Sequence, residues 1–213
     1  MVSRAGRAAD EVRRGVLDGT YRVGSRLSEP DLCARLDVSR NTLREAFRML
    51  ADERLVVHEL NRGVFVRVPG AQDVRELFEA RRLVECAAVD GWTPARAGVD
   101  AVHRAVERGE GRAAVGDWTG VAAADVEFHR ALTALGSARV DDLMQGVWHE
   151  VRLAFHVVAA PARFHGAYLP RNRSVLTTLL ERGGPAAARE LRTYLDEAER
   201  EVLLAYRGPG PGA

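Results

Sequence analysis

Two short helical patterns that flank a tight turn constrain the fold of this chain more than any other feature. In the segment SEPDLCARLDVSR, Ser28 and Asp31 form a capping-box pattern at the start of a short helix. Asp37 follows this helix, and aspartate tolerates the left-handed conformation that a tight turn requires. Ser39 is then a favourable N-cap for a second helix. Two short helices joined by such a turn predict a helix-turn-helix.

The second of these helices has one apolar face and one arginine-rich face. Its apolar residues recur at helical spacing as Leu43, Ala46, Phe47 and Leu50. A solvated surface helix would show the same pattern, but the second helix of a helix-turn-helix enters the major groove of DNA. Arginine pairs well with guanine, and asparagine pairs well with adenine. The predicted DNA-binding residues of this helix are therefore Ser39, Arg40, Asn41, Thr42, Arg44 and Arg48.

A β-hairpin is predicted directly after the second helix. Residues 55–67 contain two runs of strand-forming residues on either side of Asn61, Arg62 and Gly63, which suit a turn. A hairpin in this place makes the helix-turn-helix a winged one, with Arg62 at the tip to contact the minor groove or a phosphate. A small edge hairpin without a ligand is the alternative. We add Arg62 and Gly63 to the predicted DNA-binding residues.

Residues 8–68 as a whole resemble the winged helix-turn-helix domain of the GntR family of bacterial transcriptional regulators. The string LSEPDLCARLDVSRNTLREAFRML carries the most specific part of this resemblance. The resemblance implies that Arg40 and Arg44 are the main DNA-reading arginines and that Gly63 is the wing glycine. The glycine that the family has in its turn is replaced by Asp37, which the turn accepts at some conformational cost.

The composition bounds the remaining possibilities. A chain of 213 residues with 46% hydrophobic residues is long enough for one large domain or two small ones. We find no apolar run near membrane-spanning length and no leader, so we expect a cytoplasmic protein without a membrane partner. Cys33 and Cys86 are expected to be small buried hydrophobes in a reducing compartment. Residues 1–70 carry 13 arginines against 10 acidic residues, a weak basic bias that is compatible with DNA binding.

Beyond Val68-Pro69-Gly70 the sequence predicts helices throughout. Six helical segments are expected, at residues 71–92, 94–110, 118–136, 140–160, 170–183 and 185–206. The predicted fold class is mainly α, with an N-terminal winged helix-turn-helix followed by an all-α antiparallel helical bundle. We predict a DNA-binding domain at 1–68, a linker at 69–73, an effector-binding and dimerisation domain at 74–207, and a disordered tail at 208–213.

The helical region also carries a family resemblance. The linker, the segment RELFEARRLVE and the segment DVEFHRALTALG together resemble the FCD effector-binding domain of the FadR subfamily of GntR regulators. With about six helices rather than seven, the region is similar to the shorter, VanR-like branch. The resemblance covers residues 71–206, and it implies a bundle that binds a small-molecule effector. Its most specific piece runs from Asp125 to His129.

Asp125 and His129 are the residues most suited to hold a metal. They are four residues apart, so they share one helix face and can jointly chelate an ion; a polar pair that borders the core is the alternative. In the FCD family two further histidines typically complete this pair, and the resemblance places Asn172 and Tyr194 at their positions. A carboxamide and a phenol are poorer ligands than imidazole. We therefore expect a degenerate site with weak metal affinity or none.

The same polar residues are expected to form an effector pocket. We expect a carboxylate-type metabolite and assign to its site Arg81, Asp125, His129, Arg152, His156, Asn172 and Tyr194. His149 and His156, seven residues apart on one helix face, could replace one missing metal donor. No cofactor is certain.

Two functions remain open at this stage. The first is a ligand-responsive DNA-binding regulator, a repressor that binds a palindromic operator as a homodimer. The second is a metal-dependent enzyme that uses Asp125 and His129. The sequence has no HExxH motif, no nucleophile elbow and no phosphate-binding glycine loop, so we favour the regulator and expect no catalysis.

Overall fold

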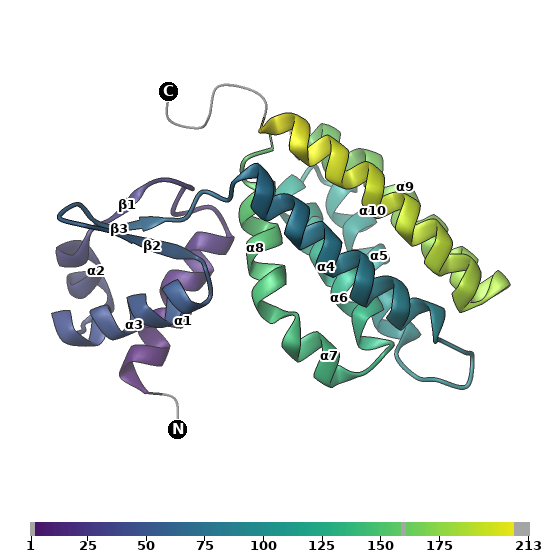
Figure 1. Cartoon of the computed structure of the whole chain (residues 1–213), viewed down its shortest axis with the longest axis horizontal. Helices are drawn as coiled ribbons and strands as arrows, with labels where there is room; N and C mark the ends of the chain where they lie inside the picture. Colours follow the sequence, from purple (N-terminus) through teal and green to yellow (C-terminus); the bar gives the residue numbers. More distant parts are fainter. Residues whose placement is uncertain (1–2, 159–160, 207–213) are drawn as a thin grey trace.

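Ten helices and three short strands make up residues 3–158 and 161–206, which are the residues that this computed structural model describes. The elements form an N-terminal winged part and a larger C-terminal helical part (Figure 1). This arrangement confirms the predicted fold class. Among the described residues, no helix is both long enough and apolar enough to cross a membrane.

The winged part contains three helices and a small antiparallel sheet. Its elements are α1 Arg4–Leu17, β1 Arg26–Leu27, α2 Glu29–Leu36, α3 Arg40–Asp52, β2 Val56–Glu59 and β3 Gly63–Val66. The predicted hairpin is confirmed as β2 and β3, and β1 pairs with the other edge of β3. The sequence analysis missed β1, because two residues are too few to show the alternation of a strand.

Local chemistry fixes the helix-turn-helix as expected. The Ser28 hydroxyl accepts a hydrogen bond from the Asp31 amide, and the Ser39 hydroxyl accepts one from the Thr42 amide at 3.2 Å. Asp37 has a left-handed backbone with φ 50° and ψ 52°, so it forms the turn between α2 and α3. The predicted apolar face of α3 is buried, at Leu43, Ala46, Phe47 and Leu50.

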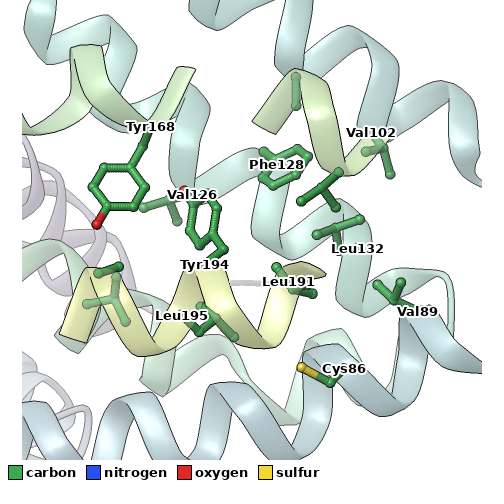
Figure 2. Close-up of a cluster of buried hydrophobic side chains, with 14 of the residues drawn as sticks. Cys86, Val89, Val102, Val126, Phe128, Leu132, Tyr168, Leu191, Tyr194 and Leu195 are labelled. Atoms are coloured by element: carbon green, nitrogen blue, oxygen red, sulfur yellow. The ribbon is translucent and has the colours of Figure 1, made fainter. Parts of the chain in front are cut away.

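The C-terminal part consists of helices that surround one apolar core. They are α4 Ala71–Asp90, α5 Val99–Ala114, α6 Trp118–Ala134, α7 Ala138–Leu143, α8 Gln145–Phe155, α9 Pro161–Arg182 and α10 Gly184–Ala205. Helix α5 packs on α6, and α10 packs on α4. Figure 2 shows part of the core, where Phe128 and Leu132 of α6 face Leu191 of α10.

Several predicted boundaries in this part were wrong. Seven described helices replace the expected six, because the segment at 140–160 divides at Met144, which has ψ near 0° and interrupts the helix; its last two residues, 159 and 160, lie outside the described range. The segment expected to start at Pro170 belongs to α9, which continues through this proline. Core packing by Phe164, Tyr168 and Val175 on both sides of the proline compensates for the backbone bond that it removes.

Two smaller boundary predictions also need correction. The segment at 94–110 starts only at Val99 and then continues past its glycines to Ala114. Gly109 is compatible with this helix because the side chain of Leu169 packs against its backbone, where a Cβ would lie 2.9 Å from that side chain. The predicted linker at 69–73 is too long, since α4 begins at Ala71. The predicted tail at 208–213 lies outside the described residues.

Cys86 is buried in the helical core, as expected. Cys33 in α2 is only half-buried, so the expectation of a buried side chain fails there.

Helix α8 belongs to both parts of the molecule. In Figure 1 it lies on the side of the bundle that faces the winged part. Leu153 is fully buried in the core of the winged part, whereas Trp148 and Phe155 are buried in the core of the bundle. Glu150 accepts a hydrogen bond from Arg67, just after β3, at 2.6 Å. These contacts make α8 the connection between the winged and helical parts.

A second contact of α8 involves the end of α3. Glu53 follows α3 and accepts two hydrogen bonds of 2.6 Å from Arg13 of α1. Its other close neighbour is His149 of α8, with the imidazole Nδ1 3.5 Å from the carboxylate. Burial opposes the charge of Glu53, but His149 and Arg13 outweigh it and lower the pKa of this carboxyl to about 2. Glu53 therefore stabilises the fold while it is ionised.

We predict that Glu53→Gln destabilises the protein at pH 7 by roughly 1–3 kcal/mol and that this difference shrinks in acid. The pKa of Glu53 is about 2 in the folded chain against 4.5 for an ordinary glutamate, so its contribution is present above pH 4.5 and is lost as the pH falls towards 2. Urea unfolding of both proteins at pH 7 and pH 3 measures this. Glu11→Gln, at an exposed pair on α1, is the control and should change little. An equal deficit of the Glu53→Gln protein at both pH values would contradict the prediction.

Candidate functional site

The exposed face of α3 carries the predicted DNA-contacting side chains. Arg40, Asn41, Arg44 and Arg48 are all exposed, as is Ser39 at the N-cap. Thr42 is half-buried, and its hydroxyl lies 2.9 Å from that of Ser39. The first turn of α3 is thereby held by the cap, and its long polar side chains extend away from the core.

Arg44 has one acidic neighbour on α2. Its Nε lies 3.6 Å from the Glu29 carboxylate, while 61% of the Arg44 side chain remains exposed. An exposed pair of this kind is weak, so it leaves the guanidinium available to an external acceptor.

The turn of the wing is fixed by two residues with positive φ. Asn61 has φ 59° and Gly63 has φ 105°, and the latter value is strained for any residue with a Cβ. Arg62 lies between them, 70% exposed, paired with Glu59. Leu60 is 89% exposed at the same tip and was not among the predicted residues. Its place directly before the Asn-Arg-Gly turn was the signal that could have identified it.

Five of the predicted effector residues come together inside the helical part. Arg81 of α4, Asp125 and His129 of α6, Asn172 of α9 and Tyr194 of α10 are buried and connected by hydrogen bonds. We call them, with Glu85 and His165, the polar cluster. Tyr194 extends from α10 beside Tyr168, as Figure 2 shows.

The polar cluster is a chain of charged and polar groups. Arg81 Nε donates to Glu85 at 2.7 Å, and the second oxygen of Glu85 lies 2.6 Å from His129 Nδ1. On its other side, His129 Nε2 lies 3.2 Å from the Tyr194 hydroxyl. That hydroxyl donates to Asp125 at 3.2 Å. Each charged group of the polar cluster therefore has a polar or oppositely charged neighbour within hydrogen-bonding distance.

Tyr194 supplies the proton donor at one end of the polar cluster. Its hydroxyl has one proton, which it donates to Asp125. The two ring nitrogens of His129 face the Glu85 carboxylate and the Tyr194 oxygen. Arg81 and His129 therefore lie against the two acids, and buried carboxylates need partners of this kind.

The pKa shifts agree with ionised carboxylates. Burial opposes the charge on Asp125, but the nearby His129 and His165, and a hydrogen bond from Asn172 at 2.8 Å, lower its pKa below the usual value. Burial likewise opposes the charge on Glu85, and Arg81 and His129 lower the pKa of that carboxyl. Burial and the charge of Asp125 raise the pKa of the Tyr194 phenol well above its usual value. Tyr194 therefore remains a proton donor.

Sequence reasoning missed two members of the polar cluster. Glu85 lies four residues after Arg81 on α4, and this ion-pair spacing on the helix face of Val74 and Phe78 was a usable signal. His165 was missed because the residues before Pro170 were not recognised as helix. Its spacing of seven from Asn172 puts both on one face of α9. The Nδ1 of His165 lies 3.9 Å from Asp125 and has no hydrogen-bond partner.

The donor set does not fit the metal that the FCD resemblance implies. Asn172 and Tyr194 lie where the resemblance implies two histidines, and they hydrogen-bond one oxygen of Asp125 instead of supplying imidazole donors. Within residues 3–158 and 161–206, no group of three or more His, Cys, Asp or Glu side chains is arranged to hold an ion. His149 does not supply the missing donor, since it faces Glu53 of the winged part.

Arg152 and His156 lie apart from the polar cluster. Arg152 on α8 donates to the backbone carbonyl of Leu17, the last residue of α1, at 2.7 Å. His156 follows α8 and lies beside Gly19. Both line a cavity between the winged and helical parts, and His165 lines it too. The single predicted effector set is therefore divided between two places, with His165 between them.

Comparisons with known proteins agree with this architecture. Residues 4–66 match the family model of bacterial regulatory proteins, gntR family, and residues 76–197 match that of the FCD domain. A transcriptional regulator GntR of known crystal structure from Rhodococcus sp. RHA1 is 53% identical, with 96% of this chain and 99% of that chain covered and a TM-score of 0.92. E. coli McbR/YncC, at 17% identity over 97% and 100% of the two chains, shares the fold with a TM-score of 0.78.

Curated relatives are named as transcriptional regulators. The Nta operon transcriptional regulator of Aminobacter aminovorans is 41% identical over 69 residues, which are 32% of this chain and 33% of the relative. The chain thus matches about a third of the length of such relatives. The HTH-type transcriptional repressor RspR of Escherichia coli is 25% identical over 90% of this chain and 85% of its own. The relatives are regulators, which disfavours the alternative of a metal-dependent enzyme. The chain belongs to the GntR family of bacterial regulatory proteins and carries an FCD domain.

Proposed function

We propose that this chain is a ligand-responsive transcriptional regulator that binds an operator through α3 and the wing. The observation that carries the proposal is the exposed arginine face of α3, held in place by a capped turn and by a buried apolar face. Arg40 and Arg44 are the base-reading arginines of the proposal, supported by Ser39, Asn41, Thr42 and Arg48 on the same helix. Arg62 and Gly63 contribute from the wing, where an arginine can reach the minor groove or a phosphate.

The effector of the proposal is a small carboxylate-type metabolite that binds to the helical part. The polar cluster supports this, because its buried carboxylates depend on neighbouring basic and hydrogen-bonding groups that one added anion would disturb. Asn172 contributes a carbonyl oxygen that has no hydrogen-bond partner, and His165 contributes an unpartnered nitrogen. Buried polar atoms of this kind are costly unless something satisfies them.

The proposed regulator is a homodimer on a near-palindromic operator. One winged module makes few base contacts, and two modules related by two-fold symmetry double them. The helical part has apolar side chains available for an interface, at Leu83, Leu143, Leu180 and Leu204, which are 51–80% exposed. We further propose that the chain acts as a cytoplasmic repressor of the FadR subfamily. Assignment to the VanR-like branch remains a proposal. The number of helices no longer supports it, because the described helical part has seven helices and not six.

Replacement of the two arginines provides the test of DNA binding. Operator DNA is first selected from random duplexes with the wild-type protein, and the selected sequences should show two-fold symmetry. Arg44→Ala should then weaken binding by about 1–3 kcal/mol and relax the preference at one base pair. Arg40→Ala should act similarly, whereas Arg104→Ala, at an exposed arginine on α5, should leave the affinity unchanged.

Two results would overturn this assignment. One is unchanged operator affinity in both Arg40→Ala and Arg44→Ala proteins. The other is an equal loss in the Arg104→Ala control, which would indicate nonspecific electrostatic attraction.

Metal analysis of the protein, purified without added ions, tests the proposal of a degenerate metal site. We expect zinc and nickel far below one ion per chain, and no rise in melting temperature when zinc is added, since Asn172 and Tyr194 take the places of two imidazole donors. Stoichiometric metal that disappears in His129→Ala protein would show that the polar cluster is a metal centre instead.

A further inference from the structure

A cavity of about 470 Å³ lies between the winged part and the helical part. Its volume is in the range that drug-sized ligands occupy in proteins. The winged part contributes the end of α1 and the loop that follows, and the helical part contributes α6, α8 and α9. Its apolar walls include Leu17, Val23, Trp118, Phe155 and Val158. A ligand for this space would therefore carry a sizeable apolar body.

The polar groups around this interdomain cavity favour an anion. Arg22 lines it from the loop after α1, and Arg152 lines it from α8. The charge that opposes them is Asp18, an exposed residue at the end of α1 whose carboxylate accepts a hydrogen bond from the Thr20 amide at 2.9 Å. A carboxylate that enters the cavity can reach a guanidinium on either side, and bidentate pairing with arginine is the geometry that a carboxylate prefers.

Arg152 already donates a hydrogen bond to the winged part, which carries the proposed DNA-binding residues. Its Nη2 donates to the Leu17 carbonyl at 2.7 Å, at the C-terminus of α1. Helix α1 packs along α3, the helix with the proposed DNA-reading arginines. A ligand carboxylate is a stronger acceptor than a peptide carbonyl, because both partners of the new bond are charged. A ligand carboxylate can therefore replace the Leu17 carbonyl as the acceptor of Arg152, and the end of α1 then loses this contact with α8.

We propose that the interdomain cavity is the effector site, that it takes an organic anion with an apolar or aromatic body, and that Arg152 exchanges the Leu17 carbonyl for the anion. This inference rests on the proposed function, since it names the ligand class and the coupling of that same regulator. Ligand binding changes the position of α1, and with it that of α3, so operator affinity changes. Such coupling requires the ligand to bind one arrangement better than the other.

His165 connects the interdomain cavity to the polar cluster. It lines the cavity, is 3% exposed, and has its Nδ1 3.9 Å from Asp125 without a hydrogen bond. A small shift of α9 would close this gap. A ligand in the interdomain cavity would therefore lie next to the polar cluster through His165.

The experiment uses the wild-type protein and its selected DNA. The probes are benzoate, phenylacetate and indole-3-acetate, each paired with its uncharged primary amide. At least one carboxylate should shift operator affinity tenfold or more and bind the DNA-free protein, as measured by calorimetry. Its amide should bind at least tenfold more weakly, because it cannot form the charged pair with Arg152.

Three variants locate the site. Arg152→Gln should weaken carboxylate binding at least tenfold, Arg152→Lys less so, and Ala122→Trp, which fills the cavity wall on α6, should abolish binding. Arg104→Gln is the matched control and should bind like the wild type. Circular dichroism and melting curves check that each variant is folded, and two independent variants keep the test valid if one is not.

The outcomes separate this inference from the proposed function. Failure to select any DNA duplex would reject the regulator itself. Selection of DNA with no response to any carboxylate would overturn the effector site alone. Equal binding of carboxylates by the wild type and by folded Arg152→Gln and Ala122→Trp proteins would place the ligand elsewhere and would also overturn it.

Discussion

The burial of Leu153 in the core of the winged part is the interaction on which the rest of the structure depends. This residue belongs to α8, a helix that also buries Trp148 and Phe155 in the core of the bundle. Separation of the two parts would expose a fully buried leucine, which costs about 1.5–3 kcal/mol, and would break the bond from Arg67 to Glu150. The winged part is therefore positioned by the helical part, and a movement of α8 changes the packing of both.

The polar cluster imposes a second constraint, which is that each buried acid needs a basic or hydrogen-bonding partner. Two ionised carboxylates deep in an apolar bundle would be prohibitively costly without Arg81 and His129 beside them. These partners explain why Tyr194 suits a position where the FCD resemblance suggested a histidine: the phenol donates to Asp125 and lies 3.2 Å from His129 Nε2. They also explain why an added anion would change the cluster. A single charge placed next to a set of linked hydrogen bonds shifts several of them at once.

Local signals in the sequence were sufficient for the helix-turn-helix, because caps and turns act over three or four residues. Asp37 illustrates this, since its tolerance of positive φ is a property of the residue itself. The positions of the effector residues were harder to predict from the sequence. The spacing of Asp125 and His129 placed both on one helix face, but nothing local shows that Arg152 on α8 faces α1 instead of the bundle. Pro170 concealed His165, because a proline normally ends a helix and only core packing allows α9 to continue through it.

Differential scanning calorimetry of the full-length protein tests the central claim most directly, namely that α8 couples the two parts. A helix shared by both cores should make them unfold together, so the account predicts a single transition whose calorimetric and van't Hoff enthalpies agree. Two well-separated transitions, one for each part, would contradict it. In that case the winged part could move independently of α8, and a ligand bound between the parts would have no route to the DNA.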